Sequence, residues 1–148
     1  MIRKTSLALL LATALLVGCA TSKKGNSTAA QQPSAALNGG WILDLIPYPS
    51  AAFDSLYSDR KPELSFETAS NRFSGYTGCN RINGPLVSKG NTINFRGDIA
   101  MTKMACPGDG ESVFMENLKK INKYAVSADG KELTLIQGDI ALMRFHRK

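Results

Sequence analysis

Few side chains in this sequence of 148 residues are suited to nucleophilic or acid–base chemistry. The chain has three cysteines, Cys19, Cys79 and Cys106, and one histidine, His146, close to its end. An activated nucleophile needs a neighbouring base, and a phosphate-binding loop of the Gly-x-x-x-x-Gly-Lys type needs glycines at fixed spacing. The sequence contains no histidine–carboxylate spacing, no nucleophile elbow and no such loop. We therefore expect a protein that is not an enzyme and has no cofactor and no metal site.

Asn80 and Arg81 are the candidate binding residues, because they are the most chemically versatile side chains in a glycine-rich stretch. Asparagine tolerates a left-handed backbone and caps turns, and arginine can form paired hydrogen bonds with carboxylates or carbonyls. Both residues could therefore simply hold the loop together. Alternatively, they form a polar rim where a small molecule or a peptide strand binds. The glycines around them are Gly75, Gly78 and Gly84.

Two other groups of side chains have structural explanations. Asp109 and Glu111 precede an amphipathic segment, where acidic side chains interact favourably with a helix dipole. Methionines scattered through a small domain usually fill gaps in the core, although they could also form a site for a soft metal or an apolar surface. We expect core positions for Met101, Met104, Met115 and Met143.

The N-terminus has the pattern of an export signal. Arg3 and Lys4 precede an uncharged run of 11 residues, 7–17, which is about half the ~20 residues that span a bilayer. The end of this run and the two residues after it, Leu16-Val17-Gly18-Cys19, resemble the lipobox of bacterial lipoproteins, in which the cysteine thiol takes the lipid. The resemblance implies a signal peptide at 1–18, lipidation of Cys19 and a membrane anchor. Ala20 stands where an inner-membrane retention signal would have aspartate, so we expect an outer-membrane protein that faces the periplasm.

Residues 19–39 are poor in large apolar side chains, and we expect a flexible tether there, followed by one domain at 40–148. The formal net charge of +6 divides into +2 for each of the three segments, since 40–148 has 14 basic and 12 acidic residues. A domain with so small an excess of positive charge has no field suited to nucleic acid. We therefore expect no nucleic-acid partner.

Lipidation of Cys19 would leave Cys79 and Cys106 as an even pair in an exported chain. Exported proteins usually oxidise such pairs, so we expect a disulfide between them. Buried free thiols remain an alternative, and so does a reactive or metal-binding pair, although the sequence has no Cys-x-x-Cys motif.

Residues 40–148 have the pattern of short strands. Apolar side chains alternate around Trp41 and Leu43, and the period of two recurs at 64–66, 93–95 and 143–145. Turn-forming residues separate these runs at 69–71, 88–91, 129–130 and 137–139. Residues 111–121 instead have a helical period, and 47–60 is expected to be a surface excursion with a weak helical patch near Phe53 and Leu56. The predicted fold is mainly β (α+β by elements), a small antiparallel barrel-like sheet with one helix packed across it.

Several stretches resemble the META/HslJ domain family in their order along the chain. The most specific is Gly75-Tyr76-Thr77-Gly78-Cys79-Asn80-Arg81, which is followed by Ile82-Asn83-Gly84 and later by Met104-Ala105-Cys106. Supporting pieces lie at 40–43, 64–66, 111–118 and 133–135, so the resemblance covers residues 40–146. It implies a small barrel-like domain of bacterial envelope lipoproteins, associated with heat and antibiotic stress and with no established enzymatic activity. The 47–60 segment is longer than the usual first connection of the family.

These observations together predict an outer-membrane lipoprotein that supports the envelope under stress through protein contacts, with envelope proteins as partners. The alternative is a lipocalin-like barrel that binds a small molecule, whose identity the sequence does not indicate. The two differ physically, because an internal binder needs an apolar void of ~300 Å³ or more, whereas a contact protein has a filled interior and an exposed patch.

Overall fold

The computed structural model describes residues 35–47 and 53–148. The predicted signal peptide, Cys19 and most of the predicted tether lie outside these residues. In the described ranges, no helix has the length and apolar character that a membrane crossing requires.

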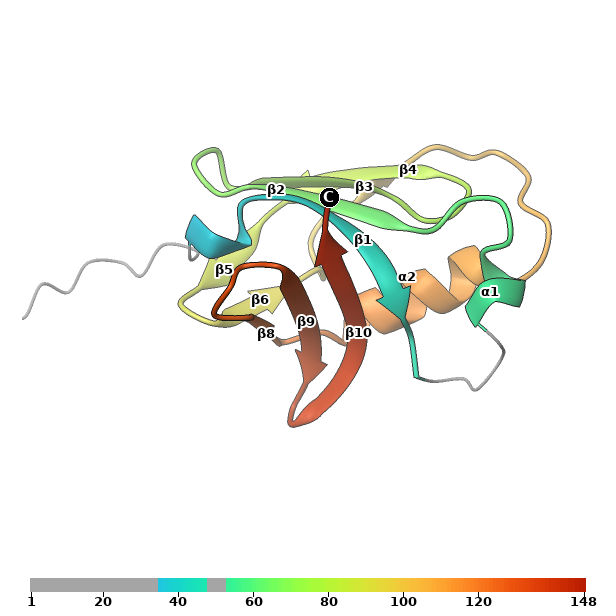
Figure 1. Cartoon of the computed structure of the whole chain (residues 1–148). Coiled ribbons are helices and arrows are strands. Elements are labelled where there is room, and N and C mark those ends of the chain that lie inside the picture. Colours follow the sequence, from blue (N-terminus) through green and yellow to red (C-terminus); the bar gives the residue numbers. More distant parts are fainter. Residues whose placement is uncertain (1–34, 48–52) are drawn as a thin grey trace, which may run out of the picture.

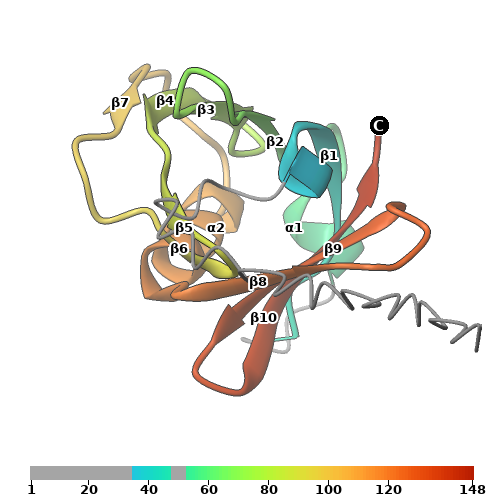
Figure 2. The ribbon, with the colours of Figure 1, turned by 90° about the vertical axis from the view of Figure 1, so that its left-hand side faces the viewer.

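The chain folds into a 10-stranded antiparallel sheet that curls around the helix α2 (Figures 1 and 2). The strand order is β5-β6-β8-β9-β10-β1-β2-β3-β4-β7, so β5 and β7 are the two edges. The strands are β1 (Gly39–Leu45), β2 (Glu63–Glu67), β3 (Arg72–Tyr76), β4 (Arg81–Pro85), β5 (Val87–Lys89), β6 (Thr92–Asn94), β7 (Ala100–Met101), β8 (Lys123–Val126), β9 (Glu132–Gln137) and β10 (Ile140–Arg147). The helical elements are η1 (Ala35–Leu37), α1 (Phe53–Leu56) and α2 (Gly110–Lys120).

The predicted fold class is confirmed: the sheet is a half-barrel with one main helix. Most neighbouring strands follow each other in the sequence and form hairpins, while β1 pairs with the last strand, β10. Register shifts occur between Leu43 and Leu45 in β1 and between Ala141 and Met143 in β10. Such bulges bend strands, which suits a sheet that curls.

The predicted turns also lie between strands. Asn71, between β2 and β3, has a φ of 51°, and Gly130 and Gly138 have φ values of 71° and 60°. These left-handed conformations favour asparagine and glycine, which explains why these residue types occur there.

Large apolar side chains fill the concave side of the sheet. Phe114 and Leu118, on one face of α2, are fully buried against side chains from β1, β2, β3, β9 and β10. The helical period predicted for 111–121 is therefore confirmed, because its apolar face covers the sheet. The largest fully buried residues include Trp41, Phe66, Phe73, Phe95, Phe114 and Phe145.

Two segments outside the predicted strands contribute to the core. Leu37, in the part predicted to be a tether, is fully buried, and its carbonyl accepts a hydrogen bond from the Trp41 indole at 2.9 Å. The segment predicted as a surface excursion forms the expected helical patch as α1, but Tyr57 after it is only 6% exposed. A purely surface role is therefore wrong for the described part of this segment.

Candidate functional site

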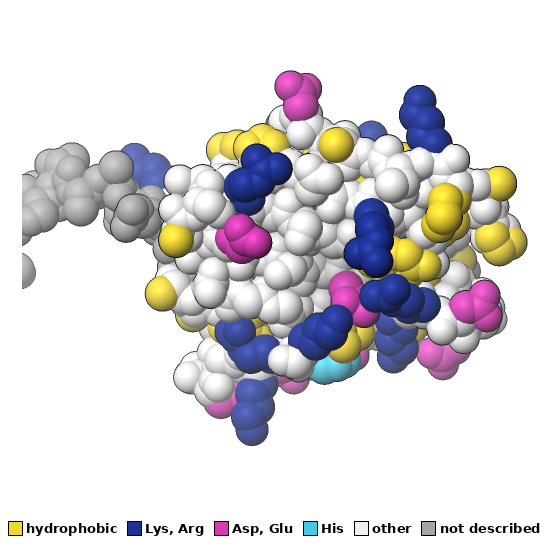
Figure 3. All heavy atoms as spheres, turned by 90° about the horizontal axis from the view of Figure 1, so that it is seen from above, with side chains coloured by type: hydrophobic (Ala, Val, Ile, Leu, Met, Phe, Trp, Pro, Cys, Tyr) yellow, Lys and Arg dark blue, Asp and Glu magenta, His cyan; other side chains and the backbone are white. Residues whose placement is uncertain are grey.

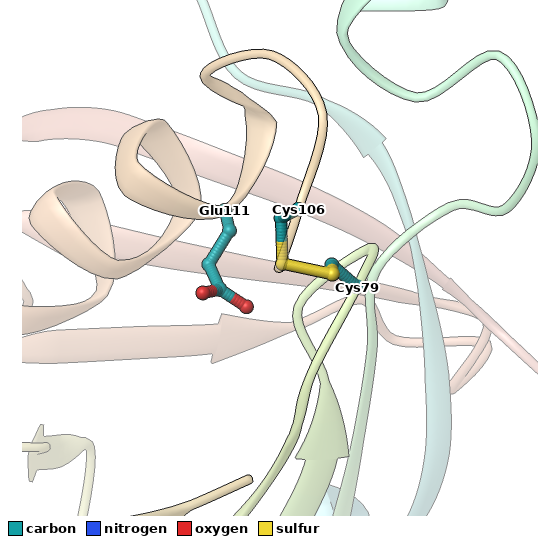
Figure 4. Close-up of side chains that lie close together, drawn as sticks. All are labelled: Cys79, Cys106 and Glu111. Atoms are coloured by element: carbon teal, nitrogen blue, oxygen red, sulfur yellow. A yellow bond between two sulfur atoms is a disulfide. The ribbon is translucent and has the colours of Figure 1, made fainter. Parts of the chain in front are cut away.

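The predicted disulfide joins Cys79 to Cys106, with the two Cα atoms 5.9 Å apart. Cys79 lies in the turn between β3 and β4, and Cys106 lies in the segment that connects β7 to α2 (Figure 4). The bond therefore ties the glycine-rich hairpin to the approach of the helix. This outcome favours the disulfide over the two alternatives left open by the sequence, free thiols and a metal-binding pair.

Glu111, in the first turn of α2, lies beside the disulfide (Figure 4). One oxygen of its carboxylate and the sulfur atoms of Cys79 and Cys106 all lie within 4.8 Å of one another. A cysteine binds metal as a thiolate, and these two sulfur atoms are bonded to each other. In this oxidised state the cluster does not offer a set of metal ligands.

The Asn80 side chain holds the cluster together, with only 1% of the residue exposed. Its Oδ1 accepts hydrogen bonds from the Thr102 hydroxyl at 2.7 Å and from the Met104 N–H at 2.8 Å. Its Nδ2 lies 3.2 Å from both the Met104 carbonyl and Oε1 of Glu111, and 3.1 Å from Sγ of Cys106. Asn80 is therefore a buried structural residue, and it does not form the rim of a binding site.

Glu111 receives hydrogen bonds from the hairpin as well. The Thr77 hydroxyl donates to Oε2, and the Asn80 backbone N–H donates to the same oxygen at 3.2 Å. The predicted interaction with the helix dipole explains why an acidic residue is tolerated at position 111. It does not include the hydrogen bond that the Glu111 carboxylate accepts from Thr77 in the β3–β4 turn, 34 residues earlier in the sequence. Asp109, by contrast, makes no side-chain hydrogen bond as the cap of α2.

An open hollow of about 490 Å³ lies beside the disulfide, lined by residues of the α1 segment, the hairpin turn and the start of α2. Tyr57 lines it, and burial raises the pKa of this tyrosine above its usual value. The neutral hydroxyl donates a 2.8 Å hydrogen bond to the Gly110 carbonyl, which fixes α1 against α2. The polar groups around the disulfide are thus engaged with one another, an arrangement suited to holding the fold.

The Arg81 side chain is separate from this network, although the Arg81 backbone N–H donates a 3.0 Å hydrogen bond to the Thr102 hydroxyl. It is exposed and lies on the outer face of the sheet, on the rim of a second open hollow of about 320 Å³. We call this hollow the outer groove. Its lining crosses four adjacent strands and includes Gly40, Ser65, Ser74 and Asn83, with Arg60, Glu63, Tyr76, Arg81 and Lys148.

A third open hollow, of about 720 Å³, lies along the short edge strand β7, and we call it the β7 hollow. Its apolar lining includes Phe95, Ile99, Met101 and Met115. The core prediction for the methionines holds for Met143, at 1% exposed, and Met115 is partly buried. It is wrong for Met101 and Met104, which are 40% and 59% exposed, because Met101 lies in the edge strand β7 and Met104 lies in the segment after it, on the hollow beside the disulfide.

Comparison with protein families supplies the identity of the domain. The model of the META domain matches residues 35–148, which is most of the chain and includes all the elements described above. The chain belongs to the META domain family. The match starts at Ala35, the first residue of η1.

Solved structures show the same fold at low sequence identity. An NMR structure of a protein from Burkholderia xenovorans is 20% identical, covers 99% of each chain and gives a TM-score of 0.62. A crystal structure of a DUF4847 family protein from Bacteroides vulgatus is 16% identical, covers 77% of this chain and 95% of its own, and gives a TM-score of 0.52. The comparison with curated proteins found no match.

Sequence reasoning missed three participants in the network of this META domain: Thr77, Thr102 and Glu111. The sequence did contain a signal for Thr77. A threonine hydroxyl can accept a hydrogen bond from a backbone N–H three residues later in a turn, and here the Thr77 hydroxyl lies 2.9 Å from the Asn80 nitrogen. No local pattern signals that Thr102 or Glu111 meets this turn, because those contacts depend on the tertiary arrangement.

Proposed function

We propose that this META domain protein is a lipoprotein anchored through Cys19 in the outer membrane and facing the periplasm. The lipobox-like sequence and the export signal before it support the anchor. The disulfide supports an oxidising compartment, since disulfides persist mainly in exported proteins.

Metabolic labelling tests the anchor. Cells that express the full chain are grown with an alkyne-tagged fatty acid, and the protein is isolated and coupled to a fluorophore. The wild-type protein should carry the label and sediment with the outer membrane, whereas Cys19→Ser should be unlabelled. An unlabelled wild-type protein would exclude the lipid anchor.

We further propose that the domain acts without catalysis, by contact with an envelope protein. The observation that carries this proposal is the contrast between the filled concave side of the sheet and the β7 hollow, where Met101 is exposed and Ile99 and Met115 are only partly buried. Buried aromatic residues occupy the space that a lipocalin-like ligand would need, so the contact function is favoured over the alternative. An exposed edge strand beside apolar side chains suits a partner that adds a strand to the sheet.

Site-specific photo-crosslinking in living cells tests this contact. A photoreactive phenylalanine at Met101, in the β7 hollow, should give one discrete crosslinked product. The same residue at Asp139, whose side chain is 100% exposed in the β9–β10 turn, should not give that product. Equal crosslinking at both positions, or none at Met101, would refute a specific contact at β7.

We propose that the contact maintains the envelope under stress. Cells that lack the protein should then lose viability on heat or antibiotic treatment, and the wild-type gene should restore it. Met101→Glu, which places a charge in the β7 hollow, should be expressed and lipidated normally but fail to restore viability. Full rescue by this variant would separate the stress role from the β7 contact.

A further inference from the structure

The outer groove results from the register of four strands. Gly40 pairs with Ser65, Ser65 with Ser74, and Ser74 with Asn83, so these residues form one row across β1, β2, β3 and β4. At ~4.8 Å between strands, the row is about 14 Å long. Its side chains are small or absent, and the parallel row of Glu63, Tyr76 and Arg81 forms a wall beside it.

The floor of the outer groove presents polar groups that the fold does not use. Among the described residues, the side chains of Ser65, Ser74 and Asn83 make no hydrogen bond within the protein. They offer two hydroxyl groups and one amide, which can both donate and accept hydrogen bonds. They lie on a face and not at an edge of the sheet, so a ligand here is recognised by side chains and not by strand addition.

The wall of the outer groove is basic. Lys148 and Arg60 pair with Glu63 at 2.8 Å and 3.1 Å, and Arg60 also stacks on Tyr76, 4.2 Å from the ring centroid. Within the part of the chain that the structure describes, Arg81 has no acidic partner and its side chain makes no hydrogen bond. Three cations and one carboxylate give the groove a net charge of +2. Figure 3, viewed from above this face, shows Lys and Arg side chains gathered around an acidic side chain.

We propose that the outer groove binds a sugar that carries a carboxylate. The Arg81 guanidinium pairs with the carboxylate, and the row of Ser65, Ser74 and Asn83 bonds the sugar hydroxyl groups. This combination favours an acidic sugar over an acidic peptide, because the floor offers several neutral hydrogen-bonding groups and a single unpaired cation. The outer groove shares no lining residue with the β7 hollow, so the sugar site does not depend on the proposed protein contact.

Ligand-observed NMR tests the site with three probes: glucuronic acid, glucose and acetate. The protein is the full chain, purified in a detergent without a sugar headgroup. Glucuronic acid and glucose differ only in the carboxylate, whereas acetate has the carboxylate without the sugar. We expect glucuronic acid to bind at millimolar concentration, and both glucose and acetate to bind at least about tenfold more weakly, since each lacks one part of the recognised group.

Variants assign the binding to the groove. Arg81→Ala should weaken glucuronic acid binding about tenfold and leave glucose within about twofold, because only the charge-assisted bond is lost. Ser74→Tyr, which fills the exposed floor, should abolish binding of both sugars. Arg144→Ala removes an exposed arginine outside the groove and should change neither. Unchanged melting temperatures show that the variants fold.

Three results would overturn the sugar site. The first is the absence of glucuronic acid binding. The second is acetate binding as tight as that of glucuronic acid, which would indicate charge attraction alone. The third is an equal loss of glucuronic acid binding in Arg81→Ala and Arg144→Ala, which would show that the sugar binds outside the groove.

Discussion

Replacement of Asn80 by alanine should destabilise the domain by about 2–4 kcal/mol, although it removes almost no apolar surface. The side chain accepts hydrogen bonds at 2.7 and 2.8 Å and donates two more at 3.2 Å. Each such bond contributes about 1 kcal/mol net, which gives an upper value of about 4 kcal/mol. Thr102 and Met104 are exposed, so water can replace part of their bonding, and the lower value is about 2 kcal/mol.

Urea denaturation measures this loss, and the protein carries its own probe. Trp41 is the single tryptophan and is fully buried, so its fluorescence reports unfolding. The matched control is Asn83→Ala, three residues away at an exposed position of β4, which should change the free energy of unfolding by no more than about 0.5 kcal/mol.

A loss in the free energy of unfolding of less than about 1 kcal/mol for Asn80→Ala, or one equal to the control, would refute the structural role of Asn80.

A double-mutant cycle with Glu111→Gln tests the network directly. Because the Asn80 side chain donates a hydrogen bond to Glu111, the two losses should not add and should differ from the sum by about 1 kcal/mol. Additive losses would show that the two residues stabilise the fold independently.

Three further predictions concern the disulfide, the helix start and the sheet surface. Reduction, or Cys106→Ala, should lower the free energy of unfolding by about 3–4 kcal/mol for this separation of 27 residues, and an unchanged urea midpoint would contradict the chain-entropy argument. Gly110→Ala should lower the melting temperature by several degrees, because its Cβ would lie 2.6 Å from the Leu56 carbonyl oxygen; a stable variant would mean that α1 can move. The hydrogen bond from Lys148 holds the pKa of Glu63 below its usual range, so this pair stabilises the fold at neutral pH and the contribution is lost as the pH falls through the lowered pKa. Glu63→Gln should therefore reduce the loss of stability in acid at low salt, and an identical acid profile would show that the exposed pair contributes nothing.

The sequence predicted the strand-rich fold because the inward positions are almost all apolar. The alternating residues Trp41, Leu43, Leu64, Phe66 and Phe145 are each 0–1% exposed. The edges were harder to predict, since β7 consists of two residues and has no period to detect. β6 ends at Asn94, before Phe95, although Phe95 continues the alternation and is buried. Burial of Phe95 comes from tertiary packing and not from strand pairing.

The chemistry of the candidate site was only partly visible in the sequence. The cysteine pair could be predicted because two thiols that follow an export-signal pattern are usually oxidised, although free thiols had remained an alternative. Asn80 remained undecided between a structural residue and a ligand-binding residue, and its burial favours the first. The sequence analysis explained Glu111 by its interaction with the helix dipole. That explanation accounts for an acidic residue at the start of α2, but it does not include the hydrogen bond with Thr77 on a distant hairpin.

The two surface sites could not have been located from alternation alone. Alternation indicates that Ser65, Ser74 and Asn83 face outward, since Leu64, Phe73 and Ile82 face the core. It does not indicate that the three align, because alignment depends on the lengths of the two turns between their strands. A shift of two residues in either hairpin would keep every apolar side chain inside and yet break the row of Ser65, Ser74 and Asn83. The outer groove is therefore a property of register, and the hairpin turns are as important to it as the residues that line it.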